Sequence, residues 1–315
     1  MKTKKLLTSE VKRPSDKSIN NTVSKVIGEK VTEVTLIERG AINFPFKVKT
    51  EKGNLFVKVY SKKDWPEPEK PTWVANQLER NKVPHAKQVF YDRTSNLFPC
   101  GIEITEYIEG VNADKVIGKG DITYKQFCED VAEVLHKVHQ IEVGGYGSVN
   151  NGQGRHETLN GALFTSMDRS FDQLTEHLES AEDLRKKCKE TVEDKLRPYQ
   201  NRFKPTLVHH DVHPSNCRYS NDGELFIIDW DNTMLFPWPM ELAIATYWSH
   251  KPTIMREAFL KKYGEEDFTR NELDTILEAF HIYQRSLLIH YYLVDKGDKE
   301  KFEKVLAKMV DNPNS

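Results

Sequence analysis

Cysteine is scarce in this chain, and the few cysteines present are scattered. There are four among 315 residues, without any Cys-x-x-Cys spacing, at positions Cys100, Cys128, Cys188 and Cys217. This usage argues against a disulfide framework or a cysteine-built zinc site and favours a reducing compartment. Long apolar runs are lacking too, since the most apolar stretch, residues 286–294, is far short of the ~20 residues that a membrane span needs. The basic start has no apolar segment behind it, so we expect a cytoplasmic protein without a membrane segment.

An excess of charge of one sign is also missing. Lys plus Arg total 46 against 48 Asp plus Glu, a net charge of −2, which argues against nucleic acid or an anionic membrane as a partner. The two ends of the chain nevertheless differ. Residues 1–110 carry 20 basic and 14 acidic residues, and the remainder carries 26 and 34. This asymmetry favours an anionic ligand on the first part and a cationic one on the second.

The hydrophobic patterns divide the chain into a β-rich part and a helical part. Alternating residues predict strands between 31 and 60 and a strand at 102–108, with a helix opening at Pro71 and ending near Asn81. Helical spacing then predicts helices around 127–138, two charged ones within 157–203, and a long one at 272–294. We predict an α+β protein: a small β-rich N-lobe with one main helix at 1–105 (a basic tail at 1–20), a hinge at 106–110, and a larger, mainly helical C-lobe at 111–315.

The most informative stretch follows the short run Leu207-Val208. It reads His-His-Asp-Val-His-Pro-Ser-Asn from His209 to Asn216, and Ile-Asp-Trp follows at 228–230. Asp222-Gly223 between two β-like runs predicts a two-residue hairpin turn, in which opposed residues have numbers that sum to 445. Asn216 and Asp229 satisfy this sum, so we expect their Cβ atoms ~5 Å apart on one face. Their oxygens are the hard ligands that Mg²⁺ prefers, together with substrate phosphates.

Asp211 precedes this predicted hairpin by a few residues. A carboxylate a few ångströms from a metal-bound phosphate can accept the proton of an attacking hydroxyl. His209 would brace the same loop by hydrogen bonding. The combination predicts Asp211 and His209 as catalytic residues.

His-x-Asp-x-x-x-x-Asn followed by Ile-Asp-Trp resembles the aminoglycoside phosphotransferase family, relatives of protein kinases that phosphorylate hydroxyls of small molecules. The likeness extends from about Val31 to Tyr292. It implies a protein-kinase-like bilobal fold with Asp211 as catalytic base, and Asn216 and Asp229 as Mg²⁺ ligands. The family usually has a glycine where this chain has His210.

The resemblance extends upstream of the loop. Residues 39–43, which include Gly40 and Asn43, are similar to the family's phosphate-covering hairpin, and Lys58 then corresponds to the lysine on the ATP phosphates. The backbone at Glu106 and Ile108 corresponds to the hinge that hydrogen-bonds adenine. One departure is that residues 71–78 contain no acid to pair with Lys58; Glu69 and other acids remain candidates. Met240-Glu241-Leu-Ala stands where the family often has Asp-Leu-Ala.

These features predict an ATP- and Mg²⁺-dependent phosphotransferase that acts on a hydroxyl of a small molecule. An aminoglycoside, with antibiotic resistance as the outcome, is one candidate; choline-, homoserine-, fructosamine- and methylthioribose-type kinases are others. Glu241 follows Asp229 by only 12 positions, too few for the activation segment of a protein kinase. A nucleotide-binding pseudoenzyme, such as a spore-coat-like scaffold, remains the alternative from another class. The sequence leaves the oligomeric state open. Acids within 157–203 would suit a cationic substrate: Asp168, Asp172, Glu176, Glu179, Glu182 and Asp183.

Overall fold

The structure of the chain is a computed structural model, and it describes residues 11–38, 42–175 and 177–310. It divides into two compact units. Unit 1 comprises the chain up to Val111 together with Arg218–Asp231, and unit 2 comprises Asn112–Cys217 together with the chain from Asn232 onward. The segment Arg218–Asp231 thus joins the β-rich unit, although the sequence patterns place it within the C-terminal part.

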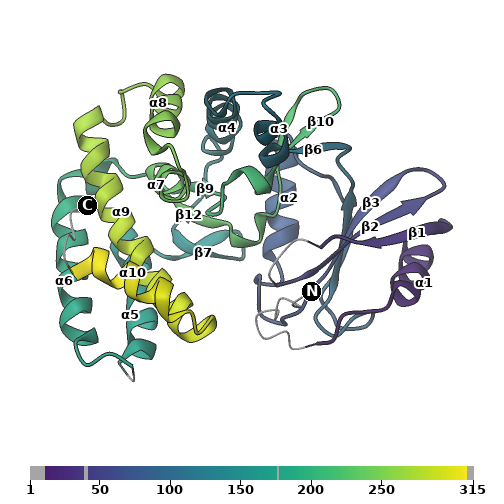
Figure 1. Cartoon of the computed structure of the whole chain (residues 1–315), viewed down its shortest axis with the longest axis horizontal. Coiled ribbons are helices and arrows are strands. Elements are labelled where there is room, and N and C mark those ends of the chain that lie inside the picture. The colour runs from purple at the N-terminus through teal and green to yellow at the C-terminus, as the bar shows by residue number, and fades with distance from the viewer. Residues whose placement is uncertain (1–10, 39–41, 176, 311–315) are drawn as a thin grey trace. The chain divides into compact units, whose positions relative to one another are not determined.

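Unit 1 is built on an antiparallel sheet with the strand order β1-β2-β3-β5-β4; strands β1, β2 and β3 are labelled in Figure 1. The elements that form it in chain order are α1 (Asp16–Ile27), β1 (Val31–Leu36), β2 (Phe44–Thr50), β3 (Asn54–Val59), α2 (Lys70–Arg80), β4 (Gln88–Asp92) and β5 (Ile102–Glu106). Alternate residues of the strands are buried, and Ile19 and Val23 of α1 pack against them. The predicted strands and the helix beginning at Pro71 are confirmed. Helix α1 was not predicted, because residues up to 20 were interpreted as a basic tail.

A smaller sheet with the order β11-β10-β6 contains the segment that follows β5. Its strands are β6 (Gly110–Asn112), β10 (Cys217–Ser220) and β11 (Leu225–Ile227). Gly110 has φ +144°, and a Cβ there would lie 2.0 Å from the carbonyl oxygen of Tyr219. Only glycine therefore permits this close approach of β6 to β10.

Unit 2 is mainly helical, with a small sheet of order β8-β7-β12-β9. Helix α4 packs against α8, and α9 packs against α5, α6 and α7 (Figure 1). The elements are α3 (Ala113–Lys119), α4 (Tyr124–Val138), β7 (Tyr146–Asn150), β8 (Gln153–His156), α5 (Leu159–Leu174), α6 (Ala181–Leu196), β9 (Thr206–Val208), β12 (Met234–Phe236), α7 (Pro239–Tyr247), α8 (Pro252–Tyr263), α9 (Arg270–His290) and α10 (Lys299–Val310). Short helical turns stand at Arg197–Arg202, Pro214–Asn216, Trp230–Asn232 and Tyr291–Asp295. The helices expected at 127–138, within 157–203 and at 272–294 are confirmed as α4, α5, α6 and α9.

The four cysteines are all buried thiols. Burial raises the pKa of Cys188 to about 11 and that of Cys128 to about 12. Burial likewise raises the pKa of Cys217. These side chains therefore fill the core as small apolar groups.

Candidate functional site

In unit 1, Lys58 lies at the centre of a buried group of charges. Its side chain extends from β3, and the register of the sheet pairs it with Glu103 of β5. The Lys58 Nζ atom lies 3.0 Å from Glu103 Oε2, 2.6 Å from Asp231 Oδ1 and 3.9 Å from Asp229 Oδ1. Lys58, Glu103, Asp231 and Asp229 form what we term the lysine cluster.

The charged groups of the lysine cluster shift one another's pKa values. Burial by itself favours the neutral amine, but the carboxylates of Asp231, Glu103 and Asp229 raise the pKa of Lys58 above its usual value. Burial would also raise the pKa of Glu103, and the ammonium group outweighs it and lowers that pKa. For Asp231, burial prevails and raises the pKa to about 6, even though Lys58 opposes the shift. The single positive charge of Lys58 therefore does not compensate the negative charges of all three carboxylates in the lysine cluster.

Hydrogen bonds hold the acids of the cluster in place. Glu103 accepts hydrogen bonds from the Tyr60 hydroxyl at 2.9 Å and from Gln88 Nε2 at 2.8 Å. Asp231 Oδ2 accepts one from Asn43 Nδ2 at 2.9 Å, and the Asn43 amide oxygen accepts the Ser61 N–H at 3.2 Å. Asn43 thus anchors an acid of the lysine cluster. Gly40, its predicted companion in phosphate binding, lies outside the described residues.

The acid that pairs with Lys58 differs from the sequence-based candidate. Glu69 is the residue that precedes α2, whereas Lys58 forms its close ion pairs with Glu103 and Asp231. The suggestion of Glu69 is therefore wrong in this structure. Glu103 was missed because its role depends on the β3–β5 register. The available signal was the acid between Ile102 and Ile104, two residues that the sequence predicts to be buried.

Asp229 has an unusual backbone conformation. Its φ is +65°, which is rare for a non-glycine residue, and its side chain is 52% exposed. Backbone strain of this kind persists only where the surroundings impose it, and it is common at functional sites. One carboxylate of the lysine cluster is thus accessible to solvent while Asp231 is buried.

In unit 2, the loop between β9 and the helical turn Pro214–Asn216 holds Asp211. Asp211 Oδ2 accepts hydrogen bonds from Asn216 Nδ2 at 3.1 Å and from Asn232 Nδ2 at 3.3 Å. Asn216 Nδ2 also donates to the Asp211 carbonyl at 3.0 Å. The Asp211 N–H donates to Nδ1 of the fully buried His209 at 3.2 Å. The loop therefore fixes the Asp211 carboxylate by contacts on both sides.

Glu241 holds the backbone of this loop by hydrogen bonds. It lies in α7, is fully buried, and accepts hydrogen bonds from the N–H groups of His209 and His210. Its Oε2 lies 3.9 Å from His139 Nε2. Burial would raise the pKa of Glu241, but the contacts of His139 and His209 outweigh it and lower that pKa. Glu241 therefore acts as an ionised anchor for the loop that carries Asp211.

The backbone conformation of His210 is one that suits glycine, the residue that the resembling family usually has at this position. Its φ is +65°, in the left-handed region that glycine adopts without strain. A histidine is strained in this conformation. The hydrogen bonds that Glu241 accepts from the His209 and His210 N–H groups help to offset the strain.

We expect Glu241→Gln to destabilise the protein by about 1.5–3 kcal/mol, because an amide NH₂ would face a buried N–H group. The sign of the pH dependence follows from the lowered pKa of Glu241. Its stabilising contribution is complete above the ordinary glutamate pKa and is lost as the pH falls through the lowered folded value. Urea unfolding at pH 7 and in acid measures both effects. The exposed Glu190→Gln serves as the control; an equal effect of both substitutions at pH 7 would contradict the anchor role.

The hairpin turn between β10 and β11 differs from the two-residue turn expected. The Ser220 N–H donates to the Glu224 carbonyl at 2.9 Å, and the Gly223 N–H donates to the Ser220 carbonyl at 3.0 Å. The loop therefore spans residues 221–223, with Gly223 at φ +82°. Opposed residues then sum to 444, and a slip of one residue reverses which faces meet. The register argument for placing Asn216 opposite Asp229 is wrong, and their joint metal binding stays a prediction.

The predicted hinge residues Glu106 and Ile108 lie in unit 1 where β5 passes to β6. The Glu106 N–H donates to the Lys87 carbonyl at 2.9 Å. The Ile108 carbonyl accepts a hydrogen bond from Arg218 Nε at 2.6 Å. Arg218 was not singled out from the sequence, since no local pattern indicates its partner 110 residues away.

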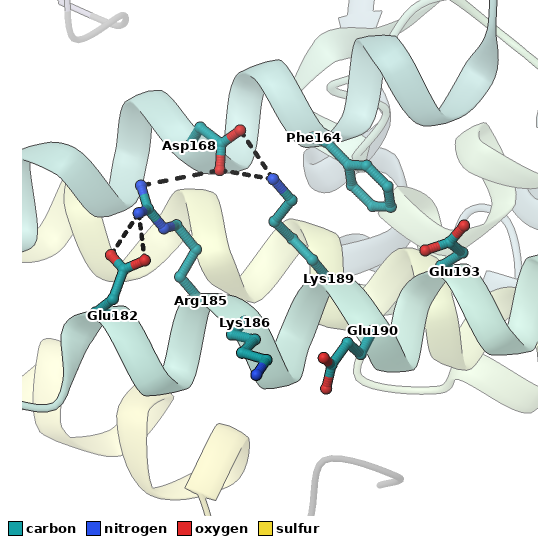
Figure 2. Close-up of a pocket in the computed structure, with 8 residues that line it drawn as sticks. All are labelled: Phe164, Asp168, Glu182, Arg185, Lys186, Lys189, Glu190 and Glu193. Atoms are coloured by element: carbon teal, nitrogen blue, oxygen red, sulfur yellow. Dashed lines mark hydrogen bonds and ion pairs between the residues drawn. The ribbon is translucent and has the colours of Figure 1, made fainter.

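Three of the six acids expected to attract a cationic substrate form ion pairs inside unit 2. A groove of about 460 Å³ lies along α5 and α6 (Figure 2). In it, Lys189 Nζ lies 2.9 Å from Asp168 Oδ2 and 5.1 Å from the ring centre of Phe164, and Arg185 pairs with Glu182. Arg185 also pairs with Asp172 at 2.7 Å. Glu176 lies outside the described residues. These ion pairs account for Asp168, Asp172 and Glu182 without a substrate.

The elements of both units define a class of fold. The solved structures that resemble the chain include choline kinase LicA from Streptococcus pneumoniae, with a TM-score of 0.67 and 17% identity over 94% of this chain and 99% of that one. Aminoglycoside phosphotransferase APH(4)-Ia gives 0.68 and 14% over 94% and 97%. Spectinomycin phosphotransferase APH(9)-Ia, in complex with ADP and spectinomycin, gives 0.62 and 16% over 96% and 97%. The predicted α+β, protein-kinase-like fold is confirmed.

The family follows from the sequence match. Residues 33–274 match the phosphotransferase enzyme family known as APH, so the chain belongs to that family and is a phosphotransferase. The predicted family resemblance is confirmed. A comparison with curated protein sequences gave no match. Within the described ranges, no helix combines the length and the apolar character that a membrane span needs.

Proposed function

We propose that this phosphotransferase transfers the γ-phosphoryl group of ATP to a hydroxyl of a small molecule, with Mg²⁺. The observation that supports this most directly is the Asp211 carboxylate, held by the amides of Asn216 and Asn232 on a loop anchored by Glu241. A fixed carboxylate can orient the acceptor hydroxyl and take its proton as the new P–O bond forms. His209 keeps the loop in shape through its hydrogen bond with the Asp211 N–H.

The residues proposed to hold Mg²⁺ fit a hard cation. Asn216 uses its NH₂ group in the bonds to Asp211, which leaves its amide oxygen as an acceptor. Asp229 offers a half-exposed carboxylate. No three His, Cys, Asp or Glu side chains converge on a metal position in the ranges that the structure describes. Mg²⁺ needs only one or two protein carboxylates when phosphates complete its shell. When bound, it would supply positive charge to the phosphate oxygens.

The other proposed contacts place the nucleotide. Lys58, held by Glu103 and Asp231, would present its ammonium group to phosphate oxygens as a point charge. The backbone at Glu106 and Ile108 would bind adenine. Asn43, with Gly40, was expected on the phosphates; its present contacts support an indirect role through Asp231.

For the acceptor, we propose a hydroxylated amine. The resembling structures are a choline kinase, a phosphotransferase in complex with hygromycin B and another in complex with spectinomycin, and choline and both antibiotics carry hydroxyl groups and cationic nitrogen. The chain beyond residue 110 has an acidic excess, with 34 acidic and 26 basic residues. Kinases of the homoserine, fructosamine and methylthioribose type remain alternatives within this family.

An ADP-release screen tests the proposal. The purified protein, ATP and Mg²⁺ are combined with choline, aminoglycosides, spectinomycin, homoserine and sugar acceptors, with Asp211→Asn as the blank. We expect acceptor-dependent ADP release above the blank for at least one hydroxylated amine. ATP binding without turnover on any acceptor would instead favour the scaffold alternative.

A further inference from the structure

The segment that joins β5 to β6 exposes a short pattern of backbone donors and acceptors. The Glu106 carbonyl accepts a hydrogen bond from the adjacent Thr105 hydroxyl at 3.2 Å, which leaves room for a second donor. The Ile108 N–H has no hydrogen-bond partner within the described part of the chain. An acceptor at Glu106 is thus followed by a donor at Ile108.

The next acceptor along this edge, the Ile108 carbonyl, faces the cationic side chain of Arg218. Its Nε donates to the Ile108 carbonyl at 2.6 Å, and its Nη2 donates to the Gly110 carbonyl at 2.5 Å. The guanidinium also lies 5.1 Å from the ring centre of Tyr107 and 3.3 Å from its hydroxyl. These charge-assisted bonds fix a fork of N–H donors against the Ile108 carbonyl.

Backbone contacts on either side of Arg218 hold its strand against residues 109–110. The Asn221 N–H donates to the Glu109 carbonyl at 3.2 Å, and Gly110 approaches Tyr219 so closely that a Cβ has no space. Strand β10 and residues 109–110 are therefore held together on either side of Arg218. Since unit 1 contains residues 107–110 and 218–221, the contacts of Arg218 belong to one compact body.

The two purines make different demands on such an edge. Adenine presents a donor, its 6-amino group, beside an acceptor, N1, and this order matches the Glu106 carbonyl and the Ile108 N–H. Guanine presents an acceptor, O6, beside the donors N1–H and N2–H. In the position that adenine takes, guanine would place its O6 against the Glu106 carbonyl and its N1–H against the Ile108 N–H. Guanine must therefore shift along the edge to the next hydrogen-bonding group. In the shifted position O6 meets the Ile108 N–H, and N1–H and N2–H need the Ile108 carbonyl.

We infer that Arg218 makes this phosphotransferase select adenine over guanine nucleotides, because its guanidinium places cationic N–H donors at the carbonyl to which guanine would direct its own donors. The inference rests on the proposed function, since it takes the Glu106–Ile108 edge as the base-binding edge. Selectivity of this kind uses repulsion against the wrong ligand as well as attraction for the right one. A guanine N–H directed at the Ile108 carbonyl would meet the Arg218 N–H donors and would have to share that oxygen with a charge-assisted bond, so at least one of its two N–H groups would pair poorly.

Binding of AMP-PNP and GMP-PNP, measured by calorimetry with Mg²⁺, tests this without any acceptor. We expect the wild-type protein to bind AMP-PNP at least about tenfold more tightly than GMP-PNP, the difference that one unpaired hydrogen-bonding group produces. Arg218→Met keeps the apolar stem and removes the guanidinium. We expect it to lower the ratio of the two dissociation constants (GMP-PNP over AMP-PNP) by about tenfold.

The matched control is Lys47→Met. Lys47 Nζ lies 4.1 Å from the ring centre of the same Tyr107 and 3.5 Å from Glu109 Oε2, yet it bonds to neither carbonyl. We expect it to leave the ratio unchanged. If Arg218→Met does not fold, as judged by circular dichroism, Arg218→Lys decides the question, because a point charge cannot serve both carbonyls and the ratio should still fall.

The outcomes separate this inference from the proposed function. Equal wild-type affinity for both nucleotides, or a ratio that stays constant in the folded Arg218 variants, overturns the inference and leaves the phosphotransferase proposal standing. A wild-type protein that binds neither nucleotide overturns both. If Arg218 had a purely structural role, its substitution would weaken the binding of both nucleotides alike. The ratio of the two dissociation constants is therefore the decisive measurement.

Discussion

Asp211→Asn is expected to lower the rate of phosphoryl transfer by ~10²–10⁴-fold, the usual contribution of a positioned general base. The substitution keeps the shape of the side chain. One oxygen of the new amide can still accept from Asn216 and Asn232, so the loop should keep its conformation. What is lost is the capacity to accept the hydroxyl proton. Nucleotide binding should persist, because the change leaves the lysine cluster untouched.

Steady-state kinetics on the acceptor found by the ADP-release screen measure this effect. Asp222→Asn, in the exposed turn at 221–223, is the matched control and should retain full turnover. Turnover of Asp211→Asn equal to wild type would show that the base lies elsewhere. A variant that also loses AMP-PNP binding would point to damage beyond the proton acceptor.

Lys58→Met is expected to destabilise unit 1 by about 3–5 kcal/mol and to abolish turnover. Removing the ammonium leaves the buried carboxylates of Glu103 and Asp231 without their counter-charge, and the loss of one partner from a buried ion pair has this magnitude. Adding Glu103→Gln should restore part of the stability. The Tyr60 hydroxyl can then accept from the new amide instead of donating. Turnover should stay lost.

Denaturant unfolding of the single and double variants measures the coupling between the two residues. The control is Lys49→Met, an exposed lysine on the neighbouring strand β2, for which a change within about 0.5 kcal/mol is expected. Additive effects of Lys58→Met and Glu103→Gln would contradict a functional pairing of these side chains. Full turnover in Lys58→Met would remove the lysine from the nucleotide site.

The sequence identified those site residues that belong to a local pattern. Lys58 lies on a strand whose alternation is plain, and Asp211 and Asn216 belong to one short motif. Their partners are different. Glu103 faces Lys58 only because β3 pairs with β5 in one particular register. Sequence periodicity identifies strands but does not decide how two distant strands align.

The turn at 221–223 shows the same limit at shorter range. Asp-Gly favours a two-residue turn, yet the chain forms a three-residue loop with Gly223 in the left-handed region. Both turns use glycine for its conformational freedom, so composition alone does not distinguish them. A difference of one residue was enough to defeat the geometric argument for Asn216 and Asp229. Helix α1 was missed for another reason: the basic residues before it masked a clear Ser15 cap and a Gly28 end.

The burial of every thiol in this chain has a practical consequence. An alkylating reagent attacks the thiolate, so Cys100, Cys128, Cys188 and Cys217 are shielded for as long as the core stays closed. Cys100 lies in unit 1, whereas the other three lie in unit 2. The rate at which each becomes labelled in dilute denaturant therefore reports the opening of its own unit, and mass spectrometry of the labelled peptides can follow the two units separately without any introduced probe.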